Sequence, residues 1–318
     1  MAKIFLTGAS GYIGGDLLYL LAQSHPEYTV RALNRDPAKG EAINKAFNGV
    51  QLVDGTLDDA DLISQEAEDA DVVLHLAANK HLSSVEAIHR GLQAKLKNNR
   101  TPFWVQVSGA SGLAAAEIAD KSRVPGTPSD AVYNDLEGID SIWSLIKQHP
   151  FREVDNYILS VATNTPTIKT ALILPPIIYG QGRGPVNQRS VQIPELAKAT
   201  LERQRGLQVG PGLSRWGNIH IRDLSQLLLR LVENAVEGNG DSNVWGQNGL
   251  YLTSSGELSF GDISKRIAAA AFRIGLVPNK EIDELNGQQA DELLPHGAVL
   301  LHQKIISEEM RFIIYGDP

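Results

Sequence analysis

The chain has 318 residues, of which 42% are hydrophobic and 21% charged, and its formal net charge is −8. This length allows one large core or two modest domains, and the composition is that of an ordinary soluble globular protein. Because the chain has no cysteine, disulfides, thiolate nucleophiles and thiolate metal sites are excluded. The acidic balance argues against broad binding to nucleic acids.

No apolar run approaches the roughly 18 residues that a membrane helix needs, and no signal peptide precedes the first predicted strand, Lys3–Thr7. The histidines show no spacing typical of metal ligands. We therefore expect a cytoplasmic protein, a monomer or a homodimer, with no membrane, nucleic-acid or metal partner.

Short apolar runs alternate with helical patterns through the first half of the chain, which is typical of βαβ units and a parallel sheet. Strands are predicted over residues 3–7, 28–33, 49–53, 71–76, 104–107 and 170–174, and helices over 16–24, 85–97 and 154–163. After Pro175 the sequence predicts a turn-rich loop over 180–185, helices over 194–205 and 223–234, and short strands over 207–209 and 250–252.

These elements predict an α/β protein of the Rossmann type, with a doubly wound, mainly parallel sheet of about seven strands flanked by helices. Residues 1–175 would form this dinucleotide-binding domain, and residues 176–318 a smaller α/β substrate lobe that is interleaved with it. Segment 114–148 is long and weakly patterned, so we expect a substrate loop there.

A glycine-rich turn, Gly8-Ala9-Ser10-Gly11-Tyr12-Ile13-Gly14, follows the first strand and opens a helix. Its glycines permit a tight turn, close approach of backbone amides to a pyrophosphate, and packing of helix on strand. Because the flanking elements are correctly spaced, the motif predicts a dinucleotide site rather than an unliganded turn. The predicted contacts are Gly8, Ser10, Gly11, Tyr12, Ile13 and Gly14.

The position after the second strand distinguishes the two nicotinamide cofactors. An acidic side chain there would accept hydrogen bonds from the adenosine ribose of NAD. The chain instead has Asn34 and Arg35, and an arginine suits the 2′-phosphate of NADP through charge-assisted contacts. NADP(H) is therefore favoured, while Asp36, one position later, keeps NAD(H) as the alternative.

Further motifs follow in order along the chain. They are His75-Leu76-Ala77-Ala78, Val105-Gln106-Val107-Ser108-Gly109, Pro175-Pro176-Ile177-Ile178-Tyr179-Gly180 and Asn218-Ile219-His220-Ile221-Arg222-Asp223-Leu224. Together with the glycine-rich turn, this series resembles the extended and atypical short-chain dehydrogenase/reductases. The resemblance is strongest to NAD-dependent epimerase/dehydratase and NmrA-like proteins, and among them to fungal members.

This resemblance implies further cofactor contacts on the loops after strands three to six. They are Thr56, Leu57, Ala77, Ala78, Asn79, Ser108, Pro175 and Ile178. Thr56 stands where many relatives have an aspartate that contacts the adenine, so a hydroxyl would replace a carboxylate. Asn187, Arg189 and Ser190 follow the glycine-rich loop and could hydrogen-bond a substrate in the cleft between the lobes, and Tyr179 is a further candidate for substrate binding.

The chain departs from the family at the catalytic pair. Active relatives use Tyr-x-x-x-Lys on the helix before strand six, where the Tyr transfers a proton and the Lys lowers its pKa. The matching stretch here reads Phe151-Arg152-Glu153-Val154-Asp155, and no Tyr in the chain has a Lys four residues later. Because a phenylalanine cannot transfer a proton, the usual machinery is missing.

The candidates for the missing catalytic chemistry are Ser108, Ser111, Tyr133, His81 and Asp155. Ser108 and Ser111 flank the position of the family's serine, and the alternative is that both bind backbone in a loop. Tyr133 could supply a phenol from the substrate loop and His81 a proton donor or acceptor, although both also fit structural roles. Asp155 could accept hydrogen bonds from ribose hydroxyls.

Three functions remain open. The first is NADP(H)-dependent hydride transfer to a carbonyl, imine or alkene of a small molecule in secondary metabolism, since the cofactor carries the difficult chemistry. The second is a non-redox isomerase, epimerase or cyclase that uses the cofactor structurally, and the third is an NmrA-like redox sensor without catalysis. The missing Tyr and Lys favour the last two, the predicted cleft favours the first two, and we expect the oxidoreductase.

Overall fold

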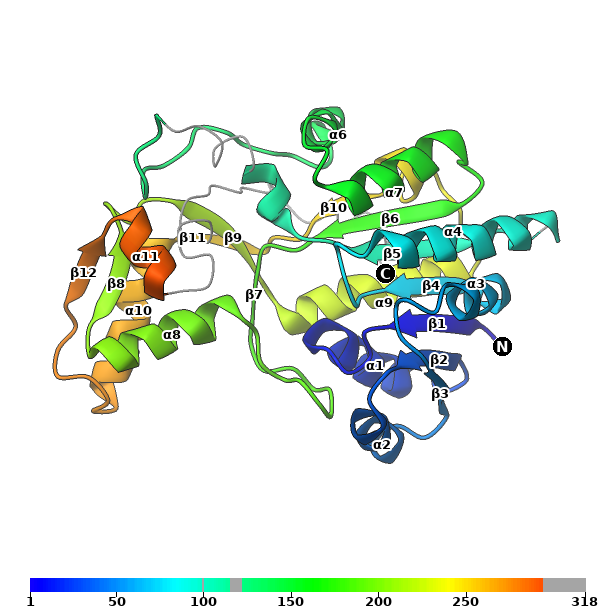
Figure 1. The fold of residues 1–318 in the computed structure, drawn as a ribbon, viewed down its shortest axis with the longest axis horizontal. Coiled ribbons are helices and arrows are strands. Elements are labelled where there is room, and N and C mark those ends of the chain that lie inside the picture. Colours follow the sequence, from blue (N-terminus) through cyan, green and yellow to red (C-terminus); the bar gives the residue numbers. More distant parts are fainter. Residues whose placement is uncertain (99, 115–121, 294–318) are drawn as a thin grey trace, which may run out of the picture.

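Seven parallel strands form one sheet through the middle of the protein (Figure 1). The structure, a computed structural model, describes residues 1–98, 100–114 and 122–293. Along the chain, the strands of this sheet are β1 (Lys3–Thr7), β2 (Thr29–Asn34), β3 (Val50–Asp54), β4 (Val72–His75), β5 (Phe103–Val107), β6 (Lys169–Leu174) and β10 (Leu250–Leu252). Across the sheet, they lie in the order β10-β6-β5-β4-β1-β2-β3. The predicted Rossmann-type fold is confirmed.

Helices cover both faces of this sheet. One face carries α1 (Tyr12–Ser24), α2 (Pro37–Ala46) and α9 (Ile221–Val236), and the other α3 (Ala60–Asp69), α4 (Leu82–Lys97) and α7 (Glu153–Asn164). Side chains alternate along each strand, so Ile4 and Leu6 of β1 pack into one core while Phe5 packs into the other. Strands buried on both faces read as continuous apolar runs, which explains why the sequence predicts them well.

A smaller lobe lies beyond the carboxyl ends of the strands, on the left of Figure 1. It contains a three-stranded sheet of β7 (Ile177–Tyr179), β9 (Arg215–His220) and β11 (Gly256–Ser259), and a parallel pair of β8 (Gly206–Val209) and β12 (Ile282–Leu285). Its helices are α8 (Gln192–Arg203), α10 (Phe260–Arg273) and α11 (Gly287–Leu293). This lobe therefore faces the sheet edge where doubly wound folds bind ligands.

Two elements predicted for the second lobe, a strand and a helix, belong to the Rossmann domain instead. The strand Leu250–Leu252 pairs with β6, with Leu250 opposite Leu172, and becomes the seventh strand. Helix α9 packs against α1 on one face of the sheet. The prediction was wrong for these elements because it followed position along the chain, whereas the chain returns from the second lobe to the sheet edge.

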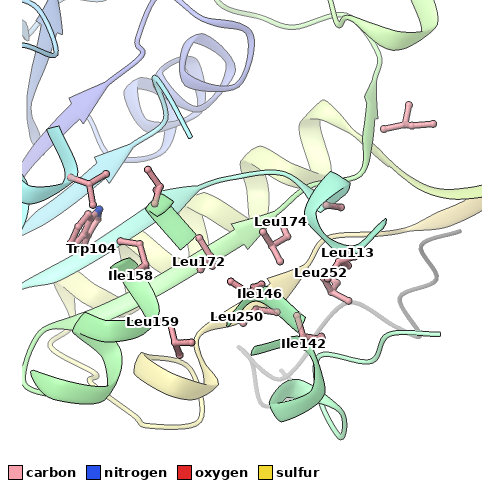
Figure 2. Packing of buried hydrophobic residues seen from close by; sticks show 14 of the residues in the cluster. Trp104, Leu113, Ile142, Ile146, Ile158, Leu159, Leu172, Leu174, Leu250 and Leu252 are labelled. Atoms are coloured by element: carbon pink, nitrogen blue, oxygen red, sulfur yellow. The ribbon is translucent and has the colours of Figure 1, made fainter. Parts of the chain in front are cut away.

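The segment predicted as a substrate loop is partly built into the core. Residues 115–121 lie outside the described residues. Beyond them, α6 (Ile139–Lys147) buries Ile142 in the core that also contains Leu252 (Figure 2). The buried Asp135 carboxylate accepts a hydrogen bond from Leu252 N at 2.8 Å. This part of the segment therefore supports the edge of the sheet, and its role as a substrate loop stays a prediction.

The first helix starts at a different residue than the sequence predicts. At the start, α1 begins at Tyr12, earlier than predicted, because Gly11 is extended and forms its N-cap. At the other end, residues 294–318, where the sequence predicts no element, lie outside the described part. Within the described ranges, no helix is long and apolar enough to cross a membrane.

Candidate functional site

A cavity of about 440 Å³ opens at the carboxyl ends of β1, β2, β3 and β4. Loops that follow parallel strands meet at this edge, which is the usual ligand site of doubly wound folds. The predicted cofactor residues in its wall are Gly8, Ser10, Gly11, Asn34, Arg35, Thr56, Leu57 and Ala77. The other predicted cofactor residues do not line this cavity: Tyr12, Ile13, Gly14, Ala78, Asn79, Ser108, Pro175 and Ile178.

The glycine-rich turn is tight because two glycines leave no room for a side chain. Gly8 has a φ of +86°, and a Cβ there would lie 2.9 Å from Ala77 N. A Cβ on Gly14 would lie 2.2 Å from the carbonyl oxygen of Gly8, so α1 can begin this close to β1 only with glycine. Gly11, the N-cap of α1, lines the cavity, so the positive end of the helix dipole lies at its wall.

The end of β2 leaves one cationic side chain unpaired at the cavity. The Asn34 side-chain amide donates to Asp36 O at 3.0 Å. The Asp36 carboxylate accepts from Ala38 N at 3.1 Å and lies 3.3 Å from Lys39 Nζ, and the backbone hydrogen bond from Lys39 lowers the pKa of this carboxyl. Arg35 is exposed in the cavity wall, and its guanidinium has no hydrogen-bond or ion-pair partner among the described residues.

Two further predicted residues lie on the loops that border the cavity. Thr56 Oγ1 donates to Asp59 Oδ2 at 3.0 Å, so its hydrogen is committed to the start of α3. His81 Nε2 lies 3.0 Å from Asp58 Oδ1, and its Nδ1 accepts from Ser84 N at 3.3 Å. Because Nδ1 accepts, Nε2 carries the hydrogen and donates to Asp58. His81 lines the same cavity as Arg35. Its role in proton transfer stays a prediction.

A second cluster lies at the end of β5, around the guanidinium of Arg152. Its Nε donates to Asp155 Oδ2 at 2.7 Å, and its Nη2 donates to Ser108 Oγ and Gly109 O, both at 3.0 Å. A Cβ on Gly112 would lie 2.7 Å from Arg152 Cζ, so this glycine makes room for the guanidinium. Ser108 and Asp155 are thus brought together by a residue for which no role was predicted. The available signal was the spacing of three residues between Arg152 and Asp155, at which helix side chains meet.

Asp155 is almost completely buried, with 1% of its surface exposed. Burial raises the pKa of its carboxyl and outweighs the opposite effect of the Arg152 charge. Its Oδ1 has no hydrogen-bond partner among the described residues. Because Oδ2 accepts from Arg152, Asp155 holds the arginine in place, and the ribose contact proposed for it stays a prediction.

Ser111 and Asn79 border the loop that follows β5. A Cβ on Gly109 would lie 3.8 Å from Asn79 Nδ2 and 3.9 Å from Ser111 Oγ, and both side chains belong to exposed residues. The Tyr133 hydroxyl, in contrast, donates to Leu113 O at 3.0 Å, which commits its hydrogen to the backbone. A ligand at the end of β5 therefore has access to Ser111 and Asn79, whereas Tyr133 supports the loop.

Pro175 and Ala78 make backbone contacts around this loop, whereas Ile178 packs its side chain against the core. Pro175 O accepts from Ala110 N at 3.0 Å, which joins the loops after β5 and β6. Ala78 O accepts from the Gln106 side chain at 3.4 Å. Ile178 lies in β7 and packs against the core under α1. The chain therefore passes the loop after β5 as it leaves the main sheet.

The predicted substrate residues lie together in an open hollow of about 560 Å³ at the start of the second lobe. Its wall includes Tyr179, Asn187, Arg189 and Ser190. Arg189 is exposed and lies 3.5 Å from Glu195. The structure therefore groups these four residues, and their contact with a substrate stays a prediction.

Two contacts fix the loop beside this hollow to α1. The Tyr12 hydroxyl donates to Gly180 O at 2.7 Å, and burial, together with the nearby Asp16 charge, raises the pKa of Tyr12 to about 12. The buried Asp16 carboxylate accepts from Arg183 Nε at 3.0 Å and Nη2 at 2.7 Å. Burial opposes ionisation of Asp16, but the hydrogen bonds from Arg183 outweigh it and lower the pKa. Tyr12 therefore joins the two lobes, while Ile13 packs against the core.

The sheet, its glycine-rich turn and the cavity define a Rossmann-type protein of the short-chain dehydrogenase/reductase kind. Residues 1–91 match the model of the NmrA-like family. The chain is 35% identical over 300 residues to the "Oxidase ucsJ" of an Acremonium species, a match that covers 92% of this chain and 85% of that relative. The protein belongs to the extended short-chain dehydrogenase/reductase superfamily, which includes the NAD-dependent epimerases and dehydratases.

More distant relatives agree with this assignment. The dTDP-glucose 4,6-dehydratase of Mycobacterium tuberculosis is 28% identical over 138 residues, which is 42% of this chain and 38% of that protein. The crystal structure of dTDP-glucose 4,6-dehydratase from Bacillus anthracis in complex with NAD superposes with a TM-score of 0.62 at 16% identity. That match covers 98% of this chain and 88% of the other and supports the fold.

Proposed function

We propose that the protein is an NADP(H)-dependent oxidoreductase that transfers a hydride to a carbonyl, imine or alkene of a small organic molecule. When bound, a nicotinamide cofactor supplies the hydride, so the protein needs chiefly to bind, orient and shield the reactants. The observation that carries the proposal is the cavity at the ends of β1–β4 with Arg35 in its wall, an arginine that has no ion-pair partner among the described residues.

The residues of this cavity fit the adenosine half of such a cofactor. Its volume of about 440 Å³ is in the range of small-molecule sites. The start of α1 offers backbone N–H groups for a pyrophosphate, and Leu33 and Leu57 offer apolar walls for a base. A side chain at Gly8 would overlap the backbone of Ala77 and close this part of the site.

Arg35 is the reason to favour NADP(H) over NAD(H). A guanidinium binds phosphate through paired, charge-assisted hydrogen bonds, and Arg35 has no competing partner among the described residues. The Asp36 carboxylate, which could accept from the ribose hydroxyls of NAD, already accepts from Ala38 N and Lys39 N. NAD(H) remains the alternative that the experiment has to exclude.

Calorimetric titration with NADPH, NADP, NADH and NAD tests this proposal. Arg35→Ala is expected to weaken NADPH and NADP binding about 10- to 100-fold, since a hydrogen bond to a charged group contributes roughly 1.5–3 kcal/mol. NADH and NAD binding should change less than about threefold. Arg90→Ala, which removes an exposed arginine paired with Asp61, is the matched control. Equal losses for all four cofactors, or no binding by the wild type, would contradict the proposal.

A second candidate function is cofactor binding without net consumption, as in an isomerase, epimerase, cyclase or redox sensor. The observation in its favour is that Phe151 and Asp155 replace the Tyr and Lys of active relatives, and that Asp155 is buried against Arg152. NADPH oxidation against ketones, imines and enones separates the two functions. Binding without oxidation across the whole panel would favour the second. Secondary metabolism and a cytoplasmic location stay predictions.

A further inference from the structure

The Arg152 cluster contains hydrogen-bond donors that the described residues do not use. Nε donates to Asp155, and Nη2 donates to Ser108 and Gly109. Nη1 has no partner among the described residues, and it is not one of the buried atoms that lack a partner. Although only 13% of the Arg152 side chain is exposed, Nη1 is therefore accessible to a ligand.

The cluster also lies at the appropriate edge of the sheet. Ser108 directly follows β5, and Ser111 and Asn79 border the same loop. In the sheet order, β5 is next to β4, whose following loop already lines the cofactor cavity through Ala77. A ligand that extends from this cavity along the carboxyl edge would therefore pass from the loop after β4 to the loop after β5, which carries Ser108.

The ion pair is not explained by stability alone. Asp155 is buried, and one of its two oxygens has no donor among the described residues. A buried ion pair stabilises a fold only when its hydrogen bonds are complete, and a buried polar atom without a partner needs an explanation, of which a functional role is one. A side chain at residue 112 would overlap the Arg152 guanidinium, so the glycine there also indicates that the position of the guanidinium matters.

We propose that Arg152 binds a negatively charged oxygen of the substrate, such as a carboxylate or an enolate-type oxygen, with Asp155 and Ser108 as positioning residues. This rests on the proposed function, because it takes the reacting end of the cofactor to lie beside β5. An arginine stays charged at all physiological pH values and does not give up its proton. The site is therefore suited to stabilising an oxygen that is already negative, and it replaces the proton-donating tyrosine by a fixed charge.

The absorbance of 4-nitrophenol, which differs between phenol and phenolate, tests this site without requiring turnover. With NADP present, the wild type is expected to bind the phenolate about tenfold more tightly than the phenol. The bound probe then ionises about one pH unit below the free probe. Arg152→Lys should keep part of this preference because the charge remains. The double variant Arg152→Gln/Asp155→Asn should lose it, and it leaves no unpaired buried charge that could unfold the protein.

Arg203→Gln is the matched control, since Arg203 also donates to an aspartate, Asp283, at 2.7 Å in the second lobe. It should retain the full preference for the phenolate. The proposal is wrong if the wild type shows no preference, or if the double variant keeps it. NADPH titration of the same samples separates a failure of this inference from a failure of the proposed function. If NADPH binds but the probe shows no preference that depends on Arg152, only this inference is overturned. If the wild type does not bind NADPH, the proposed function is overturned.

Discussion

The two ends of the carboxyl edge of the sheet are built in different ways. At one end, which is the cavity around Gly8 and Arg35 and is called the adenosine end after the proposed cofactor position, the tight turn is made by backbone: a left-handed glycine and the start of a helix. At the β5 end, which is the cluster of Ser108, Arg152 and Asp155, the surface is made by side chains from a loop and from α7. One end depends on the shape of the main chain and the other on which side chains meet.

This difference explains why the family's motif persists at one end and has changed at the other. A turn that needs glycine at Gly8 and Gly14 tolerates no side chain, because a Cβ would overlap backbone atoms. Such atoms cannot move without displacing the strand. The β5 end is built from side chains, so Phe151 and Asp155 can stand in place of the family's tyrosine and lysine within the same fold.

The largest effect is expected from Gly14→Ala, which attacks the adenosine end. The added Cβ would lie 2.2 Å from Gly8 O and push α1 away from β1. We expect a loss of roughly 4 kcal/mol in the free energy of unfolding, as for severe overpacking, and NADPH binding weakened more than about 100-fold. Denaturant titration and calorimetry measure the two quantities.

Gly49→Ala is the control for Gly14→Ala, because a Cβ at Gly49 would meet nothing within 4 Å. Only its φ of +96° should penalise the substitution, by about 1 kcal/mol. Similar losses for both variants would show that steric contact at the turn is not what makes the adenosine end sensitive.

Asp16→Asn is expected to weaken the connection between α1 and the loop of the second lobe that carries Arg183, without changing the adenosine end itself. Asp16 is fully buried and accepts two side-chain hydrogen bonds from Arg183. We expect a loss of about 2–3 kcal/mol in the free energy of unfolding, below the full effect of breaking a buried pair, because asparagine still accepts and Arg183 reaches solvent. NADPH affinity should stay within about threefold, and a much larger loss of affinity would show that the adenosine end depends on this contact with the second lobe.

His75, at the end of β4 between the two ends, should make stability depend on pH. Its Nδ1 lies 2.8 Å from Thr7 Oγ1, and burial lowers the pKa of His75 to about 3. An unfolded histidine titrates near 6.5, so below that pH the unfolded chain binds a proton that the folded chain does not. Stability contributed at neutral pH is therefore lost as the pH falls from about 6.5 towards 3, by about 2 kcal/mol between pH 7 and 5.

Denaturant titrations of the wild type and His75→Gln at both pH values test this expectation, since the variant should lack this part of the pH dependence. His25 is a useful contrast. Burial acts to lower its pKa, but the hydrogen bonds to Glu233 and Glu27 outweigh burial and raise it. Its contribution is therefore lost as the pH rises, and His25→Gln should change the pH dependence in the opposite direction. Identical pH dependence of the wild type and His75→Gln would contradict a neutral, buried His75.

The same contrast determines how much could be predicted from the sequence. The adenosine end was predictable because Gly8 to Gly14 act through local backbone geometry, and because buried parallel strands have a strong apolar pattern. Tyr12 belongs to that motif, but its hydroxyl binds Gly180, which is distant in sequence. Such a contact depends on how the second lobe packs, and the local pattern contains no information about it.

The β5 end was predictable only as a set of unconnected candidates. Ser108 and Asp155 were identified by their position in the family's pattern, whereas Arg152, which joins them, was quoted only as part of the substituted stretch. Its role depends on the direction of one long side chain and on the space above Gly112. The seventh strand, Leu250–Leu252, was misplaced for a related reason. Its partner β6 lies far away in the sequence, with most of the second lobe between the two strands.

The smallest effect is expected from Phe151→Tyr, which restores the family's tyrosine at the β5 end. The Phe151 side chain is 69% exposed, and its ring lies 5.4 Å from the ring of His149 rather than among the hydrogen bonds of Arg152. Stability should change by less than about 0.5 kcal/mol. The added phenol, followed by ultraviolet difference titration against the wild type, should ionise near its ordinary value of about 10. A tyrosine that transfers protons near neutral pH would ionise well below that value. Such a lowered pKa would show that the β5 end can still activate a tyrosine for proton transfer, as in active relatives. It would contradict the proposal that a fixed charge has replaced the tyrosine.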